Sequence, residues 1–180
     1  ASPNGNAVSV TGNAWLETSI LRVAGPGIAP GSENGIGGEV FINATVPDDP
    51  YADITRPTVP SSAESDPGSG SGTITVTPGW YPNGLTLTTG TYDLSDGIFH
   101  LGGVGLDVSG SAAVVGTGGL IHLVDPGSRI TLSGSGSITG TSYQAAGDWL
   151  GVSIVGSAQN NDWTLESSSF VDVEGLVIAP

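Results

Sequence analysis

Two histidines are the first candidates for chemistry in this 180-residue chain. His100 and His122 lie in similar settings, IFHLGG and LIHLVD. If the chain repeats with the interval that separates them, the two rings stack in one column, and two neighbouring imidazoles could bind a transition metal. No third ligand recurs at a fixed spacing from them. The pattern therefore favours a plain ladder of side chains over a metal centre.

Three aspartates offer a second kind of site. Asp48, Asp49 and Asp53 surround Pro50-Tyr51 and carry the carboxylate oxygens that Ca²⁺ prefers. The segment lacks the glycine and glutamate pattern of an EF-hand loop. A solvated acidic turn, or a tie between this segment and the body of the protein, is the alternative. We expect no required cofactor, with Ca²⁺ at these three aspartates as the one candidate.

Pairs of carboxylates suggest glycoside hydrolysis, which needs two acids about 5–9 Å apart. The pairs that are close in sequence are Asp48/Asp49, Asp93/Asp96 and Asp172/Glu174. Polysaccharide lyases and hydrolases built as right-handed β-helices carry basic catalytic residues, whereas this chain has three arginines and no lysine. It also has no cysteine for thiol catalysis. We therefore predict a protein that is not an enzyme.

The charge balance limits the partners. Seventeen Asp and Glu residues stand against three Arg, which gives a net charge of −14. This charge repels phosphate backbones, so nucleic acid is not an expected partner, and it favours solubility and divalent cations. No apolar run is long enough to span a membrane, and Ala1 suits the small-residue side of a signal-peptidase cut. We expect an extracellular or cell-surface location after removal of a signal peptide.

A repeating strand must position these side chains. Its copies read GLTL, GLDV, RITL, GVSI and GLVI, and they begin at Gly84, Gly105, Arg129, Gly151 and Gly175. Gly-Ser corners follow three copies, because glycine accepts a positive φ where the chain must turn. Strand alternation puts one aliphatic pair of each copy on a common face. We predict that these pairs stack in a single column: Leu85/Leu87, Leu106/Val108, Ile130/Leu132, Val152/Ile154 and Leu176/Ile178.

The regular interval between these copies predicts the fold class. We expect an all-β, single-domain β-solenoid, in the form of a right-handed parallel β-helix with coils of about 21–24 residues. Residues 1–46 are expected to form N-terminal coils, and residues 73–180 the main coil stack. Between them, residues 47–72 are rich in Pro, Ser, Gly and acids, which is typical of a long loop or arm.

A family resemblance rests on TPGWYPNGLTL at residues 77–87, on GTYDLSDGIFHLGGVGLDVSGSAAVVGTGG after it, and on VEGLVIAP near the end. These motifs resemble the Gly-rich, β-helical region of secreted or envelope-anchored bacterial proteins of a Tad-type pilus-assembly-like group. In that group an acidic Asp-Pro element similar to DDPYADITRP comes earlier. The resemblance covers most of residues 40–180 and implies a surface-associated architecture without catalytic residues. TPGWY is also similar to a segment of β-solenoid ice-binding proteins.

Together these observations predict a non-catalytic, extracellular structural or adhesive protein. Since no amphipathic helix is evident to cap either end of the stack, we expect neighbouring copies to cover the exposed edges. A filament or surface layer would then form by end-to-end stacking or strand exchange, through Val8, Val10, Leu176 and Ile178.

Two alternatives remain open. One is a carbohydrate-binding or polysaccharide-cleaving module, with an extracellular polysaccharide as its partner. The other is ice binding, which needs a flat face with regular ranks of threonine. The predicted outward column interrupts such ranks, because it reads Thr86, Asp107, Thr131, Ser153 and Val177.

Overall fold

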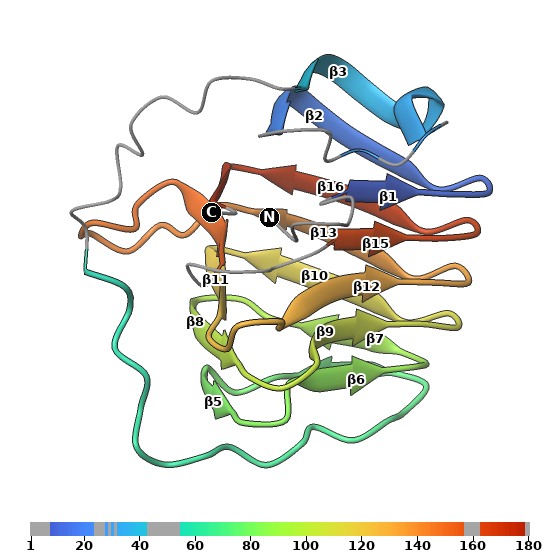
Figure 1. The fold of residues 1–180 in the computed structure, drawn as a ribbon. Coiled ribbons are helices and arrows are strands. Elements are labelled where there is room, and N and C mark those ends of the chain that lie inside the picture. Colours follow the sequence, from blue (N-terminus) through green and yellow to red (C-terminus); the bar gives the residue numbers. More distant parts are fainter. Residues whose placement is uncertain are drawn as a thin grey trace.

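The computed structural model describes residues 8–23, 28, 30, 32–42, 55–156 and 163–178. Within these ranges the protein is all-β, with seventeen short strands and one turn of 3₁₀ helix, η1 (Ser32–Gly35). No helix in the described part of the chain could cross a membrane. Figure 1 shows the strands stacked in successive layers along one axis. The expected all-β class is therefore confirmed.

The strands form three parallel sheets, which we name A, B and C. Sheet A has the order β1 (Val8–Val10), β15 (Trp163–Leu165), β12 (Arg129–Leu132), β9 (Gly105–Val108), β6 (Leu85–Leu87). Sheet B has the order β3 (Ile36–Ile42), β2 (Trp15–Val23), β16 (Phe170–Glu174), β13 (Ser137–Thr141), β10 (Ala113–Thr117), β7 (Thr91–Asp93), β4 (Thr73–Thr75). Sheet C has the order β17 (Leu176–Ile178), β14 (Val152–Val155), β11 (Gly119–Leu123), β8 (Gly97–Leu101), β5 (Gly79–Tyr81).

From residue 73 onward the chain visits the sheets in rotation. β4 lies in sheet B, β5 in sheet C and β6 in sheet A, and β7, β8 and β9 repeat this order one layer further on. Each strand pairs in parallel with the strand of the same sheet in the next layer. Short strands suit this path, because a turn must follow before the next sheet begins.

Glycine makes the corners possible. Gly110 and Gly134 follow β9 and β12 with φ of 60° and 64°, and they stack on one another at the same edge. A Cβ on Gly134 would lie 2.8 Å from the carbonyl oxygen of Gly110. The backbone conformation and the close approach both require glycine here.

The predicted column is confirmed for three of its five copies. Leu85, Leu106 and Ile130 are partners in register, and so are Leu87, Val108 and Leu132. All six side chains are fully buried. Their face of sheet A forms the dry interior of the stack, where burying a leucine or isoleucine contributes about 1.5–3 kcal/mol.

The prediction is wrong for the last two copies. Val152 and Leu176 pair with each other in sheet C, and the layer above Ile130 in sheet A is occupied by Trp163. The cause is an excursion at residues 142–151. One coil of chain separates Phe99 from its partner Ile121. About one and a half coils separate Ile121 from its partner Ile154.

The first strands of the chain, β1, β2 and β3, lie at the same end of the stack as its last strand, β17. β1 pairs with β15, with Val8 opposite Trp163, and β2 pairs with β16. The first strands of the chain therefore lie over its last layer, as Figure 1 shows for β1, β2 and β3. Strand pairing depends on matching edges and not on order along the chain, so the first described strands lie beside the last layer.

The described part of the long loop, residues 55–72, is called the arm below. It contains no strand, and its isolated bridge joins Ala63 to Trp80 of β5. In Figure 1 the arm runs down one side of the stack and under the layer of β5 and β6. The protein thus places its own segments near both ends of the stack.

The glycine corners give a direct test of this architecture. Gly134→Ala forces an alanine into a left-handed conformation and against the Gly110 carbonyl, so we expect the free energy of unfolding to fall by about 1–3 kcal/mol. Ser135→Ala, at the exposed neighbouring position, should change it by less than about 0.5 kcal/mol. Urea unfolding followed by circular dichroism measures both. Equal stability of the two variants would contradict the stacked corner.

Candidate functional site

The outward face of sheet B carries ranks of polar and aromatic side chains beside a groove. Alternate residues of its strands point inward and are buried, among them Tyr92, Val114, Ile138 and Val171. The residues between them form two ranks across the strands. One rank reads Thr91, Ala113, Ser137, Phe170 and Trp15, and the next reads Asp93, Val115, Thr139 and Asp172.

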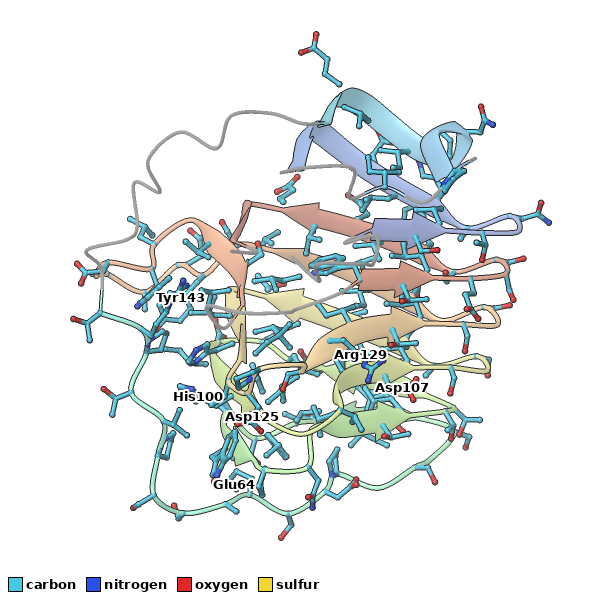
Figure 2. All side chains as sticks on the ribbon, viewed as in Figure 1. Glu64, His100, Asp107, Asp125, Arg129 and Tyr143 are labelled. Carbon is cyan, nitrogen blue, oxygen red and sulfur yellow. The ribbon has the colours of Figure 1, made fainter. Side chains whose placement is uncertain are left out.

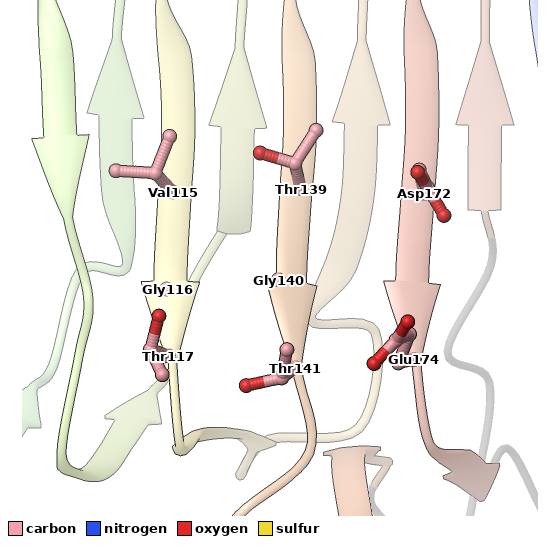
Figure 3. A pocket seen from close by; sticks show the side chains of 8 residues that line it. All are labelled: Val115, Gly116, Thr117, Thr139, Gly140, Thr141, Asp172 and Glu174. Atoms are coloured by element: carbon pink, nitrogen blue, oxygen red, sulfur yellow. The ribbon is translucent and has the colours of Figure 1, made fainter.

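A third, shorter rank completes this face. Thr117, Thr141 and Glu174 are partners in register at the ends of β10, β13 and β16, and Figure 3 shows them in one line across the three strands. Hydroxyl groups and carboxylates therefore recur at the spacing of neighbouring strands, which is about 4.8 Å.

A shallow, open groove of about 310 Å³ lies between the second and third ranks. Its lining residues are Val115, Gly116, Thr117, Thr139, Gly140, Thr141, Asp172 and Glu174. Gly116 and Gly140 form its floor, and a Cβ on Gly140 would lie 2.7 Å from the Gly116 carbonyl oxygen.

Two exposed aromatic rings lie on the same face, in the first rank. Phe170 and Trp15 are partners in register on β16 and β2, and 37% and 40% of their surfaces are exposed. The indole Nε1 of Trp15 donates a hydrogen bond of 2.6 Å to Oε2 of Glu17, which fixes the ring against its strand. Exposed aromatic residues next to polar groups are typical of a binding surface.

The electrostatics of this face are negative. Asp93, Asp172, Glu174, Glu17 and Glu39 lie on its strands against one arginine, Arg22 of β2, whereas Arg129 belongs to sheet A and Arg56 to the arm. Such a face favours neutral or cationic ligands and disfavours anionic ones. Asp172 and Glu174 are the predicted pair that falls in the groove; Asp93 lies in β7 and Asp96 at the corner after it, with φ of 54°.

The predicted histidine ladder is confirmed in sheet C. His100 and His122 are partners in register, their Nδ1 atoms are 2.9 Å apart, and the rings meet edge to face with centroids 5.1 Å apart. Both side chains are almost fully buried. Burial lowers the pKa of His100, and burial together with the charges of His100 and Arg56 lowers the pKa of His122 to about 4.

The described residues add no third metal ligand to the histidine pair. Among the described residues, no group of three or more His, Asp or Glu side chains is arranged to hold an ion. The predicted Ca²⁺ ligands Asp48, Asp49 and Asp53 lie outside the described residues, so that site stays a prediction.

The predicted assembly residues lie together at one end of the stack. Val8 and Val10 of β1 pair with Trp163 and Leu165, and the Val10 side chain is buried within its own chain. Leu176 and Ile178 of β17 pair with Val152 and Val155. β1 and β17 are the terminal strands of sheets A and C at the same end, so contact between these two strands cannot join opposite ends of successive copies.

Sequence reasoning missed the face of sheet B as a site. Trp15 and Phe170 lie near opposite ends of the chain, and only the return of the N-terminal segment joins them. A signal for the groove was present, because AVVGT and SITGT, one coil apart, share an apolar residue followed two positions later by Gly-Thr.

Comparisons with known proteins do not identify the chain. No family model matches it, and neither a curated protein nor a solved structure shows significant similarity.

Proposed function

We propose that the protein is a non-catalytic, extracellular adhesive module of the β-solenoid class, built as a right-handed parallel β-helix. Its ligand is an extended polysaccharide, which it binds on the outward face of sheet B. The observation that carries the proposal is the open groove beside the exposed pair Trp15 and Phe170. The resemblance to surface-associated bacterial proteins is consistent with this location.

The spacing of the ranks supports a polymeric ligand. Neighbouring strands are about 4.8 Å apart, which is close to the length of one pyranose unit in an extended glycan. Successive sugars lying across β10, β13 and β16 would meet a polar side chain each time, the hydroxyls of Thr117 and Thr141 and the carboxylate of Glu174. Threonine hydroxyls donate and accept hydrogen bonds with sugar hydroxyls, and carboxylates accept them.

The aromatic pair supplies the apolar part of the contact. A pyranose ring has one face of C–H groups that can stack on an indole or phenyl ring, and such anchors dominate many binding surfaces. A backbone held in a parallel sheet keeps these rings in place before the ligand arrives, which reduces the entropy lost on binding. Negative charge makes a neutral or amino-sugar polymer the preferred class.

The groove supports binding better than cleavage. Asp172 and Glu174 are exposed side chains on one strand, and the groove is shallow and open. A glycosidase instead places its two carboxyl groups on either side of the scissile bond.

Assembly into a filament remains a proposal of lower rank. The terminal strands are β1, β3 and β17 at one end and β6, β4 and β5 at the other, so a second copy could continue all three parallel sheets by translation along the stack. The arm opposes this contact, because Ala63 and Glu64 already pair with Trp80 of β5. A polymer would require the arm to move.

Binding to insoluble polysaccharides tests the proposal. We expect the protein to co-sediment with at least one neutral or amino-sugar polymer, and the double variant Trp15→Ala/Phe170→Ala to bind at least tenfold more weakly, since truncating an anchor costs about 1–2 kcal/mol. Leu150→Ala is the matched control, because Leu150 is exposed but lies outside sheet B. Unchanged binding by the double variant would contradict this site, and release of soluble sugar would contradict a non-catalytic role.

Ice binding is the second candidate, because the outward rank of sheet A differs from the column expected from the sequence. Ser153 and Val177 lie in sheet C, and the outward rank of sheet A reads Thr86, Asp107, Thr131, Thr164 and Ser9. Hydroxyl side chains thus occupy every position except that of Asp107, whose place beside Arg129 is visible in Figure 2.

Thermal hysteresis tests this candidate. If sheet A binds ice, Asp107→Thr should increase the freezing-point depression because it completes the rank, and Thr131→Asp should decrease it. Circular dichroism confirms that each variant is folded. Absence of hysteresis in the unmodified protein and in Asp107→Thr would exclude ice binding.

A further inference from the structure

The outer face of sheet C is covered, unlike that of sheet B. A second apolar cluster forms there from Leu120, Trp149, Val152 and Val155, with Ile98 and Tyr143 packed against it. The excursion at residues 142–151 contributes two of these side chains, and it folds back on itself through hydrogen bonds of 2.9 Å that join Tyr143 to Val152 and to Gly151. Figure 2 shows Tyr143 on the same side of the stack as His100.

The arm covers the rest of this side. The amide of Glu64 donates a 2.7 Å hydrogen bond to the carbonyl of Trp80, next to the Ala63–Trp80 bridge. Toward its other end Pro57 is buried, and the charge of Arg56 reaches His122. Trp80, His100 and His122 are consecutive partners in sheet C, so the arm spans this column.

The contact between the two histidines holds only for certain protonation states. At 2.9 Å one Nδ1 must donate a hydrogen and the other must accept it, so at least one ring is neutral. If both rings are protonated, two N–H groups face each other and the contact is lost. Two imidazolium charges beside Arg56 would also repel one another in a site with little water.

We propose that the arm is an acid-released latch, held over sheet C by the neutral His100–His122 pair and displaced when the pair becomes protonated. Release exposes the histidine column. It also frees Trp80 and the β5 edge from Ala63 and Glu64. The proposal is independent of polysaccharide binding, because it concerns a different sheet.

The groups around the pair make protonation unfavourable in the closed state. Arg56 faces it from the arm, and its Nη1 atom is buried without a hydrogen-bond partner among the described residues. The partners in register beyond the pair, Trp80 and Val155, carry no charge. In the described part of the chain, three carboxylates lie on this side: Glu64 against Gly79, Asp125 against Gly102, and Asp148, which is exposed in the excursion.

The direction of the pH effect follows from linkage. The pKa of His122 is about 4 when the arm is closed and returns toward 6.5 when the ring meets water. The open state therefore binds more protons, and closure weakens as the pH falls below 6.5. For His122 alone, the ratio of open to closed arm should rise about 20-fold between neutral pH and pH 5. The lowered pKa of His100 acts in the same direction.

A spin label on the arm tests the latch. The chain has no cysteine, so Thr58→Cys, exposed next to buried Pro57, gives a single labelling site. We expect the label to become more mobile, reversibly, between pH 7.5 and pH 5, which is above the isoelectric point near 4.1. A label at exposed Thr117 of β10 should not change, which separates release of the arm from global unfolding.

Two variants connect the response to the histidines. His100→Asn/His122→Asn keeps hydrogen-bonding side chains but removes both titrating rings, so its arm label should respond to acid at least tenfold less. In Arg56→Gln, His122 is easier to protonate while the arm is closed, so the response should be smaller. An immobile label at pH 5 in the unmodified chain, or an undiminished response in either variant, would overturn the proposal.

Discussion

The structure depends on the burial of apolar side chains between successive layers of strands. A layer of three short strands cannot bury its own interior residues, but the next layer covers them. Leu85, Leu106 and Ile130 show this arrangement, since each is fully buried by partners one layer away. The rest follows from keeping these layers in register. Glycine provides the corners, and hydroxyl or carboxylate side chains occupy the outward positions.

The same constraint explains how the ends and sides are covered. The last layer would expose its interior, and β1 and β2 pair with it. At the opposite end, the arm pairs with Trp80 of β5. The three sheets thereby acquire different outer faces. Sheet A presents a rank of hydroxyls interrupted by Asp107, sheet B an open groove with aromatic residues, and sheet C a covered surface over two buried histidines.

Much of the repeat could be predicted from sequence, because alternation and period are local properties. The stacking of Leu85, Leu106 and Ile130 and the pairing of His100 with His122 follow from the nearly constant length of one coil. The placement of Val152 failed because the excursion before it adds about half a coil, which keeps the strand motif at a similar spacing but moves it to another sheet. The site on sheet B needs Trp15 beside Phe170. No local pattern encodes this contact, because it depends on which free sheet edge the N-terminal strands pair with.

The most direct test of this account is the position of the N-terminal strand in the stack. Nitroxide labels at Ser9→Cys and Thr86→Cys occupy the two ends of sheet A, four strand spacings apart. Because neighbouring strands are about 4.8 Å apart, double electron–electron resonance should give one narrow distance of about 20 Å between the labels. A broad distribution, or a single distance above about 35 Å, would mean that β1 does not close the stack. In that case the aromatic site on sheet B would not exist in the form described.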